Sequence, residues 1–144
     1  MPRLTGRLAP AGRARGSAIP ALGDLSGKIL IDITNPYVGG RAQADVSTTE
    51  LIQQWAPGAR VVKGWNHVFA QNLGSPVVDG IAASVLLAGD DAGAKDTVAA
   101  LARDIGFDPV DAGPARAALT LNLLLQVLGG LGLGPDRLLK ILPR

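Results

Sequence analysis

The chain has 144 residues, which is the usual size of a single domain. It contains no cysteine, which excludes disulfide bonds and thiolate metal sites and is compatible with a cytoplasmic protein, the location we predict. The net charge of +2 is uneven: residues 1–17 hold four arginines and no acid, and beyond them the 12 acidic residues outnumber the remaining basic ones. The mildly acidic main part gives no sign of nucleic-acid binding.

The basic first segment, residues 1–17, lacks the apolar run of a secretory signal. Pro2, Pro10 and several glycines interrupt any amphipathic helix there, so we predict a disordered leader followed by one domain over residues 18–144. We predict no membrane span, because the longest apolar stretch, residues 119–133, is broken by Asn122, Gln126 and glycines.

The first predicted element is a buried strand from Ile29 to Ile33, which is apolar and rich in β-branched residues. Thr34-Asn35-Pro36 ends it, since proline cannot donate to a strand ladder. A glycine-rich loop follows over residues 37–46. Ser47 and Glu50 have capping-box spacing, which predicts a helix from Thr48 to Trp55.

The rest of the chain alternates further strands and helices. Asp90-Asp91 marks the start of one helix and Gly106 suits the position after its end. The predicted elements are strands at residues 60–63, 83–88 and 108–111, helices at residues 92–105 and 115–128, a glycine-rich link at residues 129–134 and a short basic-ended helix at residues 135–142. This alternation predicts an α/β fold with a doubly wound, mostly parallel sheet.

The sequence shows no motif for a phosphate-binding loop, a metal site or an acyl-transfer site. No G-x-G-x-x-G follows a strand; the glycines of residues 129–134 follow a helix and read as a link. There is no cluster of metal ligands. Ser47, Ser75 and Ser84 have no nucleophile-elbow context, which argues against acyl transfer.

Polar residues gather after two of the predicted strands. Asn35 follows one strand, and Asn66 and His67 follow the next. Because ligands of such sheets bind beyond the carboxyl ends of the strands, these residues are candidates for a binding site. The alternatives stay open: asparagine also caps turns, and a lone histidine is often structural or exposed.

Four ordered segments resemble the NADPH-dependent deazaflavin-coenzyme reductases (8-hydroxy-5-deazaflavin:NADPH oxidoreductases, dependent on coenzyme F420). The resemblance spans about residues 18–144. It rests on the segments GKILIDITNP (27–36), ARVVKGWN (59–66), LAGDD (87–91) and GFDPVDAGP (106–114). The same fold also forms the cytosolic part of some membrane metalloreductases.

The resemblance implies a Rossmann-like oxidoreductase that transfers hydride between NADP(H) and a deazaflavin or flavin-like acceptor, without metal or acid–base catalysis. It places Thr34, Asn35 and Pro36 near the nicotinamide, Asn66 and His67 beside the acceptor ring, and a far wall at Ala112, Gly113 and Pro114. The expected partner is a small-molecule redox acceptor, with neither nucleic acid nor membrane.

The chain also departs from this family. Gly64-Trp65 stands where Ala-Phe is usual, His67 replaces a small hydroxyl residue, and residues 115–121 lack an acid. The family's first half, with its glycine-rich phosphate-binding turn, has no counterpart, so we expect a truncated domain with impaired catalysis. We also expect a homodimer or poor solubility, because the strand at residues 29–33 would lie at an edge. The alternative is a non-catalytic remnant or dimerisation module that uses the helix at residues 115–128.

Overall fold

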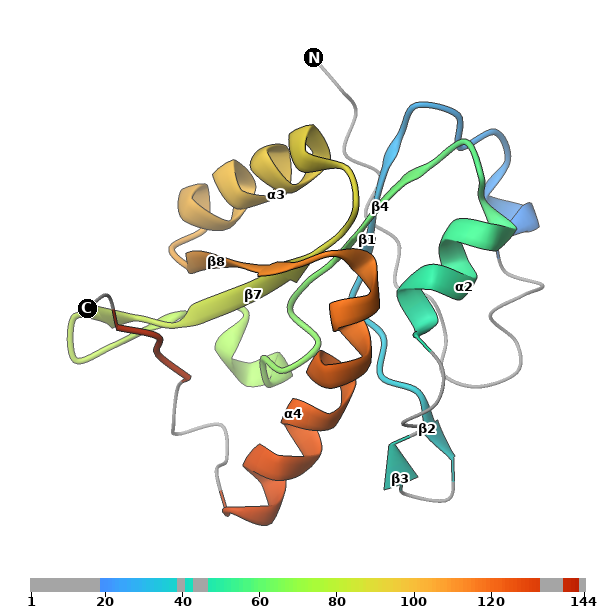
Figure 1. Ribbon diagram of the computed structural model, residues 1–144. Coiled ribbons are helices and arrows are strands. Elements are labelled where there is room, and N and C mark those ends of the chain that lie inside the picture. Colours follow the sequence, from blue (N-terminus) through green and yellow to red (C-terminus); the bar gives the residue numbers. More distant parts are fainter. Residues whose placement is uncertain (1–18, 39–40, 43–46, 133–138, 143–144) are drawn as a thin grey trace.

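The structure is a computed structural model, and it describes residues 19–38, 41–42, 47–132 and 139–142. A twisted sheet with helices on both faces forms the body, and a long helix leaves the sheet beside its centre (Figure 1). This α/β architecture is the one predicted from the alternation of apolar strands and amphipathic helices.

Four strands make the main sheet, in the order β1-β4-β7-β8. They are β1 (Ile29–Asp32), β4 (Arg60–Lys63), β7 (Ser84–Ala88) and β8 (Asp108–Gly113). The pairs β1–β4 and β7–β8 are parallel, as predicted, whereas β4 and β7 meet in antiparallel fashion. The connection from β4 to β7 contains only a short 3-10 helix, η2 (Ala70–Asn72), and a hairpin, so it lacks the crossover helix that a parallel pair needs.

The antiparallel contact has a consequence for the strand ends. Asp32 is the register partner of Lys63, Lys63 of Ala88, and Ala88 of Gly113. These residues are the last of their strands, so the carboxyl ends of all four strands converge on one row in the centre of the sheet (Figure 1). The loops that follow them therefore begin close together.

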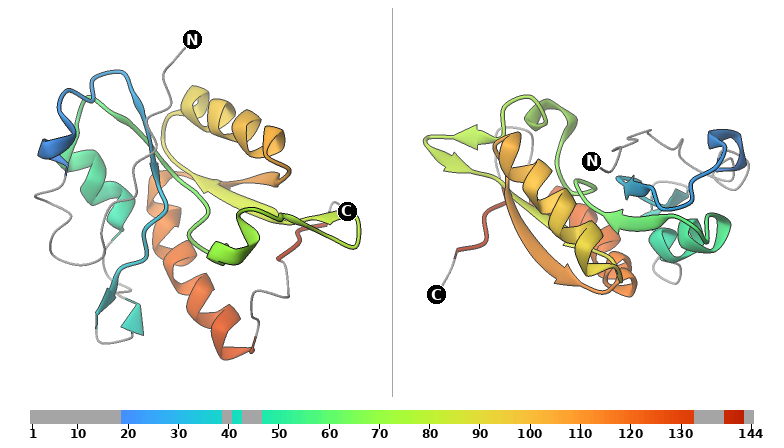
Figure 2. Two further views of the ribbon diagram at one scale, coloured as in Figure 1. Left: turned by 180° about the vertical axis from the view of Figure 1, so that it is seen from behind. Right: turned by 90° about the horizontal axis from the view of Figure 1, so that it is seen from above.

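Each face of the sheet buries its own apolar cluster. Helix α2 (Thr48–Trp55) covers one face, where Ile52 packs with Leu30 and Val61. Helix α3 (Ala92–Asp104) covers the other, and its buried side chains pack with Val62, Val85 and Leu87. Figure 2 shows the two helices on opposite sides of the strands. Burying one aliphatic side chain contributes roughly 1.5–3 kcal/mol, so both clusters stabilise the sheet substantially.

The predicted helix boundaries are largely confirmed. Ser47 caps α2 by accepting a hydrogen bond from the Glu50 amide at 3.3 Å, as the capping-box spacing predicts. Asp91 caps α3 through the Ala94 amide at 2.8 Å. Hydrogen bonding to the Arg60 guanidinium lowers the pKa of the Asp91 carboxyl to about 2, so this cap stays ionised at neutral pH.

Two small hairpins were not predicted. One pairs β2 (Tyr37–Val38) with β3 (Arg41–Ala42), inside the segment that the sequence marked as a loop. The other pairs β5 (Val77–Val78) with β6 (Ile81–Ala82). Asp79 and Gly80 join β5 to β6 with φ angles of 51° and 76°, the values of a two-residue type I′ turn. An Asp-Gly pair between apolar pairs is the sequence signal for such a turn.

The carboxyl-terminal prediction is partly wrong. Helix α4 (Ala118–Gly130) follows a 3-10 turn, η3 (Ala115–Ala117), and includes Gly129 and Gly130, which the sequence assigned to a link. The short helix predicted for residues 135–142 is wrong for residues 139–142, which are not helical. Residues 135–138 lie outside the described residues. The physical reason is that the backbone of residues 139–142 forms hydrogen bonds with Ser84 instead of with itself. The Ser84 amide donates to the Leu139 carbonyl oxygen, and the Ser84 hydroxyl accepts from the Ile141 amide.

Two glycine substitutions are expected to act in opposite directions. Gly106 ends α3 with a φ of 90°, and a Cβ there would lie 3.0 Å from Pro76 Cγ, so we expect Gly106→Ala to cost about 1–2 kcal/mol. Gly129 lies within α4 with open space around it, so Gly129→Ala should stabilise by about 0.4–1 kcal/mol. Urea unfolding of both variants measures the difference, and equal effects would contradict the assigned conformations.

Among the described residues, no helix combines the length and apolarity needed to cross a membrane.

Candidate functional site

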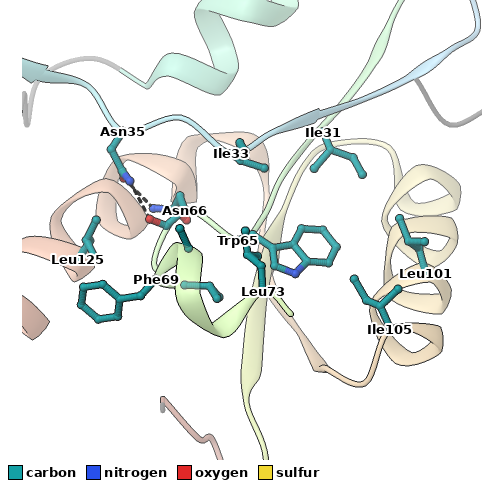
Figure 3. Close-up of a pocket in the computed structure, with 12 residues that line it drawn as sticks. Ile31, Ile33, Asn35, Trp65, Asn66, Phe69, Leu73, Leu101, Ile105 and Leu125 are labelled. Atoms are coloured by element: carbon teal, nitrogen blue, oxygen red, sulfur yellow. Dashed lines mark hydrogen bonds between the residues drawn. The ribbon is translucent and has the colours of Figure 1, made fainter. Parts of the chain in front are cut away.

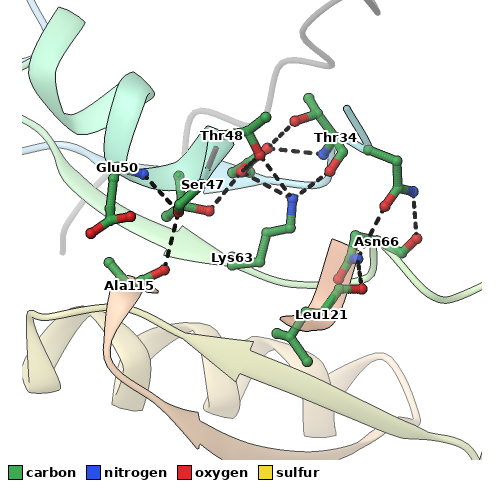
Figure 4. Close-up of polar contacts among 11 residues, drawn as sticks. Thr34, Ser47, Thr48, Glu50, Lys63, Asn66, Ala115 and Leu121 are labelled. Atoms are coloured by element: carbon green, nitrogen blue, oxygen red, sulfur yellow. Dashed lines mark hydrogen bonds and ion pairs between the residues drawn. The ribbon is translucent and has the colours of Figure 1, made fainter. Parts of the chain in front are cut away.

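A buried ion pair occupies the central row of strand ends. Lys63 Nζ lies 3.1 Å from Asp32 Oδ2, and both side chains are fully buried. Asp32 also accepts from the Thr34 amide at 2.9 Å and from the Thr34 and Thr49 hydroxyls at 2.6 and 2.8 Å. Lys63 donates in addition to the Thr34 carbonyl oxygen (Figure 4). The pair therefore fixes the turn that follows β1.

The protonation state of Asp32 is set by two opposing effects. Burial of the carboxyl raises its pKa, but the Lys63 ammonium and the hydrogen bonds from Thr34 and Thr49 lower it more, so the net shift is downward. The carboxylate is thus ionised at neutral pH and saturated with donors. It positions the strand end and is not placed to exchange protons with a ligand.

The two candidate asparagines lie against each other. Asn35 Nδ2 donates to the Asn66 carbonyl oxygen at 2.7 Å, and Asn66 Nδ2 donates to Asn35 Oδ1 at 3.1 Å. Asn66 Nδ2 also donates to the Leu121 carbonyl oxygen of α4 at 2.8 Å (Figure 4). Asn66 thereby links the loops after β1 and β4 to α4, and its Oδ1 is buried without a partner among the described residues.

His67 lies apart from this pair. It is 3% exposed, and its Nε2 donates to the Ser84 carbonyl oxygen at 3.2 Å. Burial lowers the pKa of the imidazole, as does the Lys63 charge, while the bond to Ser84 opposes the shift. His67 is therefore neutral at pH 7 and does not line the cavity beside Asn35 and Asn66.

We expect the stability of the protein to fall as the pH is lowered from about 7 toward 5, because the folded pKa of His67 lies below the unfolded value of about 6.5. The unfolded chain then binds the proton that the folded chain excludes, and the loss stops once the pH is below the folded pKa. Urea titrations across this range measure the slope. His67→Gln should remove it, and an unchanged slope in that variant would assign the effect to another group.

The three residues expected to form a far wall follow β8. Gly113 has a φ of 101°, and its carbonyl oxygen accepts from the Gly89 amide at 3.1 Å. After Pro114, the Ala115 amide donates to Asp90 Oδ1 at 2.9 Å and the Ala115 carbonyl oxygen accepts from Ser47 Oγ at 3.4 Å. Residues 112–114 thus lie beside the start of α2, and none of the three lines the apolar cavity formed by residues of β1, α3 and α4.

An apolar cavity of about 630 Å³ opens on the α3 side of the sheet. Figure 3 shows side chains from β1, from the loop after β4, from α3 and from α4 around it. The lining residues carry no formal charge, and they are Ile31, Ile33, Asn35, Trp65, Asn66, Val68, Phe69, Ala70, Leu73, Leu101, Ile105 and Leu125. A cavity of this size and character suits one small organic ligand. Among the described residues, no group of acidic or histidine side chains could hold a metal ion.

Sequence reasoning found the asparagine pair but missed three features of the site. Asp32 and Lys63 were visible as charged residues that directly follow apolar residues, at positions 29–31 and 61–62. Thr48 and Thr49 carried no such signal, because hydroxyl residues at the start of a helix are common. The cavity could not be foreseen, since it joins residues from four separate elements.

The chain is similar to two proteins of known structure. No protein-family model matches the chain. A crystal structure from Arthrobacter sp. FB24, provisionally described as an F420-dependent NADP reductase, is 33% identical, has a TM-score of 0.82, and is matched over 97% of this chain and 69% of its own. A structure of a hypothetical protein from Sinorhizobium meliloti is 28% identical with a TM-score of 0.64, over 72% of this chain and 53% of its own.

Another relative is matched over a smaller share of its own length. The protein from Rattus norvegicus named Metalloreductase STEAP3 is 38% identical over 107 residues, which are 74% of this chain and 22% of the rat protein. The chain thus spans about a fifth of that relative. Together with the structural match, this confirms the predicted Rossmann-like fold.

Proposed function

Since this chain belongs to the family of Rossmann-like NADP reductases, we propose that its site serves hydride transfer between NADP(H) and a deazaflavin or flavin-like acceptor. The observation that carries the proposal is the uncharged cavity beside the Asn35–Asn66 pair. A cavity without charge suits the ring portions of these molecules, whereas their phosphate groups would need a different environment.

The described residues fit the ring end of NADP(H). Asn66 Oδ1 is a buried acceptor without a protein partner, and a carboxamide N–H is the kind of donor that would satisfy it. The phosphate end finds no equivalent cradle among the described residues, because no glycine-rich turn there joins a strand to a helix. We therefore expect weak NADPH binding and slow turnover by this chain alone.

In this reaction NADPH would supply the hydride, and the protein would supply position. Lys63 and Asp32 hold the turn after β1, which fixes Asn35. Asn35 fixes Asn66, and the apolar walls exclude water from the rings. Such positioning can lower a barrier without an acid or a base, which agrees with the neutral, buried His67 and the saturated Asp32.

The test is hydride transfer by the purified chain. NADPH oxidation would be followed by the loss of nicotinamide absorbance, with coenzyme F420, FMN or no acceptor, and NADPH binding by its fluorescence. We expect acceptor-dependent oxidation that Asn66→Ala reduces and the exposed Gln54→Ala does not. Saturable binding with no oxidation for any acceptor would count against hydride transfer.

A second candidate, a non-catalytic dimerisation module, draws on α4. Val127 is 57% exposed and the following Leu131 is 68% exposed, whereas Leu121 and Leu128 are buried against the body. An apolar strip at the end of a helix suits a partner surface. Sedimentation of the wild type and of Val127→Lys measures the oligomeric state. A dimer that this substitution dissociates, together with a lack of NADPH binding, would favour the dimerisation module over the reductase.

A further inference from the structure

We propose that Trp65 forms the stacking surface for the planar ring of the acceptor and thereby selects which ring binds; this inference rests on the proposed function. Trp65 lies in the loop that follows β4, one residue before Asn66. Its indole lies among the residues that line the 630 Å³ cavity.

The indole is held in one position. Its ring packs edge-on against Phe107, with centroids 6.1 Å apart and an angle of 89° between the planes. The Trp65 carbonyl oxygen accepts from the Val68 amide at 3.0 Å, which closes a tight turn after β4. Figure 3 shows the flat indole at the wall of the cavity that Leu73, the α3 residue Leu101 and the following Ile105 also line. A rigid aromatic wall of this kind needs little ordering when a ligand stacks on it.

Trp65 is an unfavourable residue for stability alone. Its φ is 55°, a left-handed conformation that is strained for a non-glycine residue. Its Nε1 is buried without a partner among the described residues, which is destabilising, and a phenylalanine would avoid that loss. Backbone strain and an unsatisfied donor at one cavity wall point to a role in binding.

The surroundings define the class of ligand. The cavity walls are apolar and uncharged, the Trp65 side chain is one of them, and its Nε1 is a buried donor without a partner among the described residues. These groups suit an uncharged heteroaromatic ring that carries a hydrogen-bond acceptor on its edge. The ring of a flavin or deazaflavin has such an edge, whereas its phosphate-bearing tail would lie outside the cavity.

The chain contains two tryptophans, which provides a matched control. Trp55 is 39% exposed on α2 and lies outside the cavity. The probe is riboflavin, which has the ring without a phosphate, and binding is measured by calorimetry and by flavin emission. An indole quenches flavin emission efficiently when the two rings are nearly in contact, so the residual emission of the saturated complex reports stacking.

We expect riboflavin to bind the wild type with strongly quenched emission, and Trp65→Leu to weaken binding about tenfold, with emission restored at saturation. Trp55→Leu should change neither quantity. Trp65→Phe keeps a ring and loses the N–H donor, so its affinity should fall in between; it also serves if the leucine variant does not fold by circular dichroism.

The outcomes separate the two proposals. Riboflavin that binds equally to the wild type and to Trp65→Phe, with emission unquenched in the wild type, would overturn the role of Trp65 and leave hydride transfer standing. If neither riboflavin nor coenzyme F420 binds the wild type, then both the ring site and the proposed function are wrong. Quenching without NADPH-dependent turnover would support the ring site alone.

Discussion

Replacing Lys63 with methionine should lower the free energy of unfolding by about 3–5 kcal/mol, a large fraction of the stability of a small domain. The Lys63 ammonium is fully buried and lies 3.1 Å from the Asp32 carboxylate. Its removal leaves a negative charge in the protein interior, and the Thr34 carbonyl oxygen loses a donor as well. Urea unfolding at neutral pH measures the change.

A surface pair provides the control for this substitution. Lys95 lies 2.8 Å from Asp111, whose side chain is 64% exposed, so Lys95→Met should cost no more than about 1 kcal/mol. The double variant Lys63→Met with Asp32→Leu should recover part of the loss, because no unpaired charge then remains inside. Equal losses for Lys63→Met and Lys95→Met would show that the central pair contributes little.

The pH dependence gives a second check on the same pair. The folded pKa of Asp32 lies below its unfolded value of about 3.9, so its contribution is complete above that pH and is lost as the pH falls through the folded pKa. In Lys63→Met the burial that raises the pKa is no longer opposed by the ammonium. We therefore expect that variant to gain stability relative to the wild type as the medium becomes acidic.

Local patterns were enough to predict most of the elements. The apolar strands could be predicted from their composition, and the helix starts from single capping residues, Ser47 for α2 and Asp91 for α3. The β5–β6 hairpin was missed, although Asp79-Gly80 is a typical turn sequence, because its strands have only two residues each. The segment at residues 139–142 could not be predicted, because its conformation depends on Ser84, a residue distant in the sequence.

The site was less predictable than the fold, for a physical reason. Asn35 and Asn66 could be found because each follows a strand, but their mutual hydrogen bonds depend on strand order. His67 follows the same strand as Asn66, and one residue of difference turns it toward Ser84. The meeting of β4 and β7 in opposite directions, which gathers the strand ends, was missed because the lack of a crossover helix between them was not weighed against the general alternation of strands and helices.

We expect Asn66→Asp, a nearly isosteric change, to cost about 3 kcal/mol or more at neutral pH. The Asn66 amide nitrogen donates to Asn35 Oδ1 at 3.1 Å and to the Leu121 carbonyl oxygen at 2.8 Å. A carboxylate in its place would be buried and would face two oxygens that can only repel it. The same loss of contacts would detach α4 from the loops after β1 and β4, and ring binding should fall with stability.

The sign of the pH dependence identifies the cause. Burial and the facing oxygens would raise the pKa of the new carboxyl above its unfolded value of about 3.9, so the variant should be most stable below that pH and lose stability as the pH rises. The wild type should change in the opposite direction over the acidic range, because of Asp32 and His67. Gln54→Glu introduces the same charge at an exposed position of α2 and should leave the wild-type profile intact. If Asn66→Asp follows the wild-type profile too, the asparagine amide is not held by Asn35 and Leu121, and the link between the two loops and α4 would have to lie elsewhere.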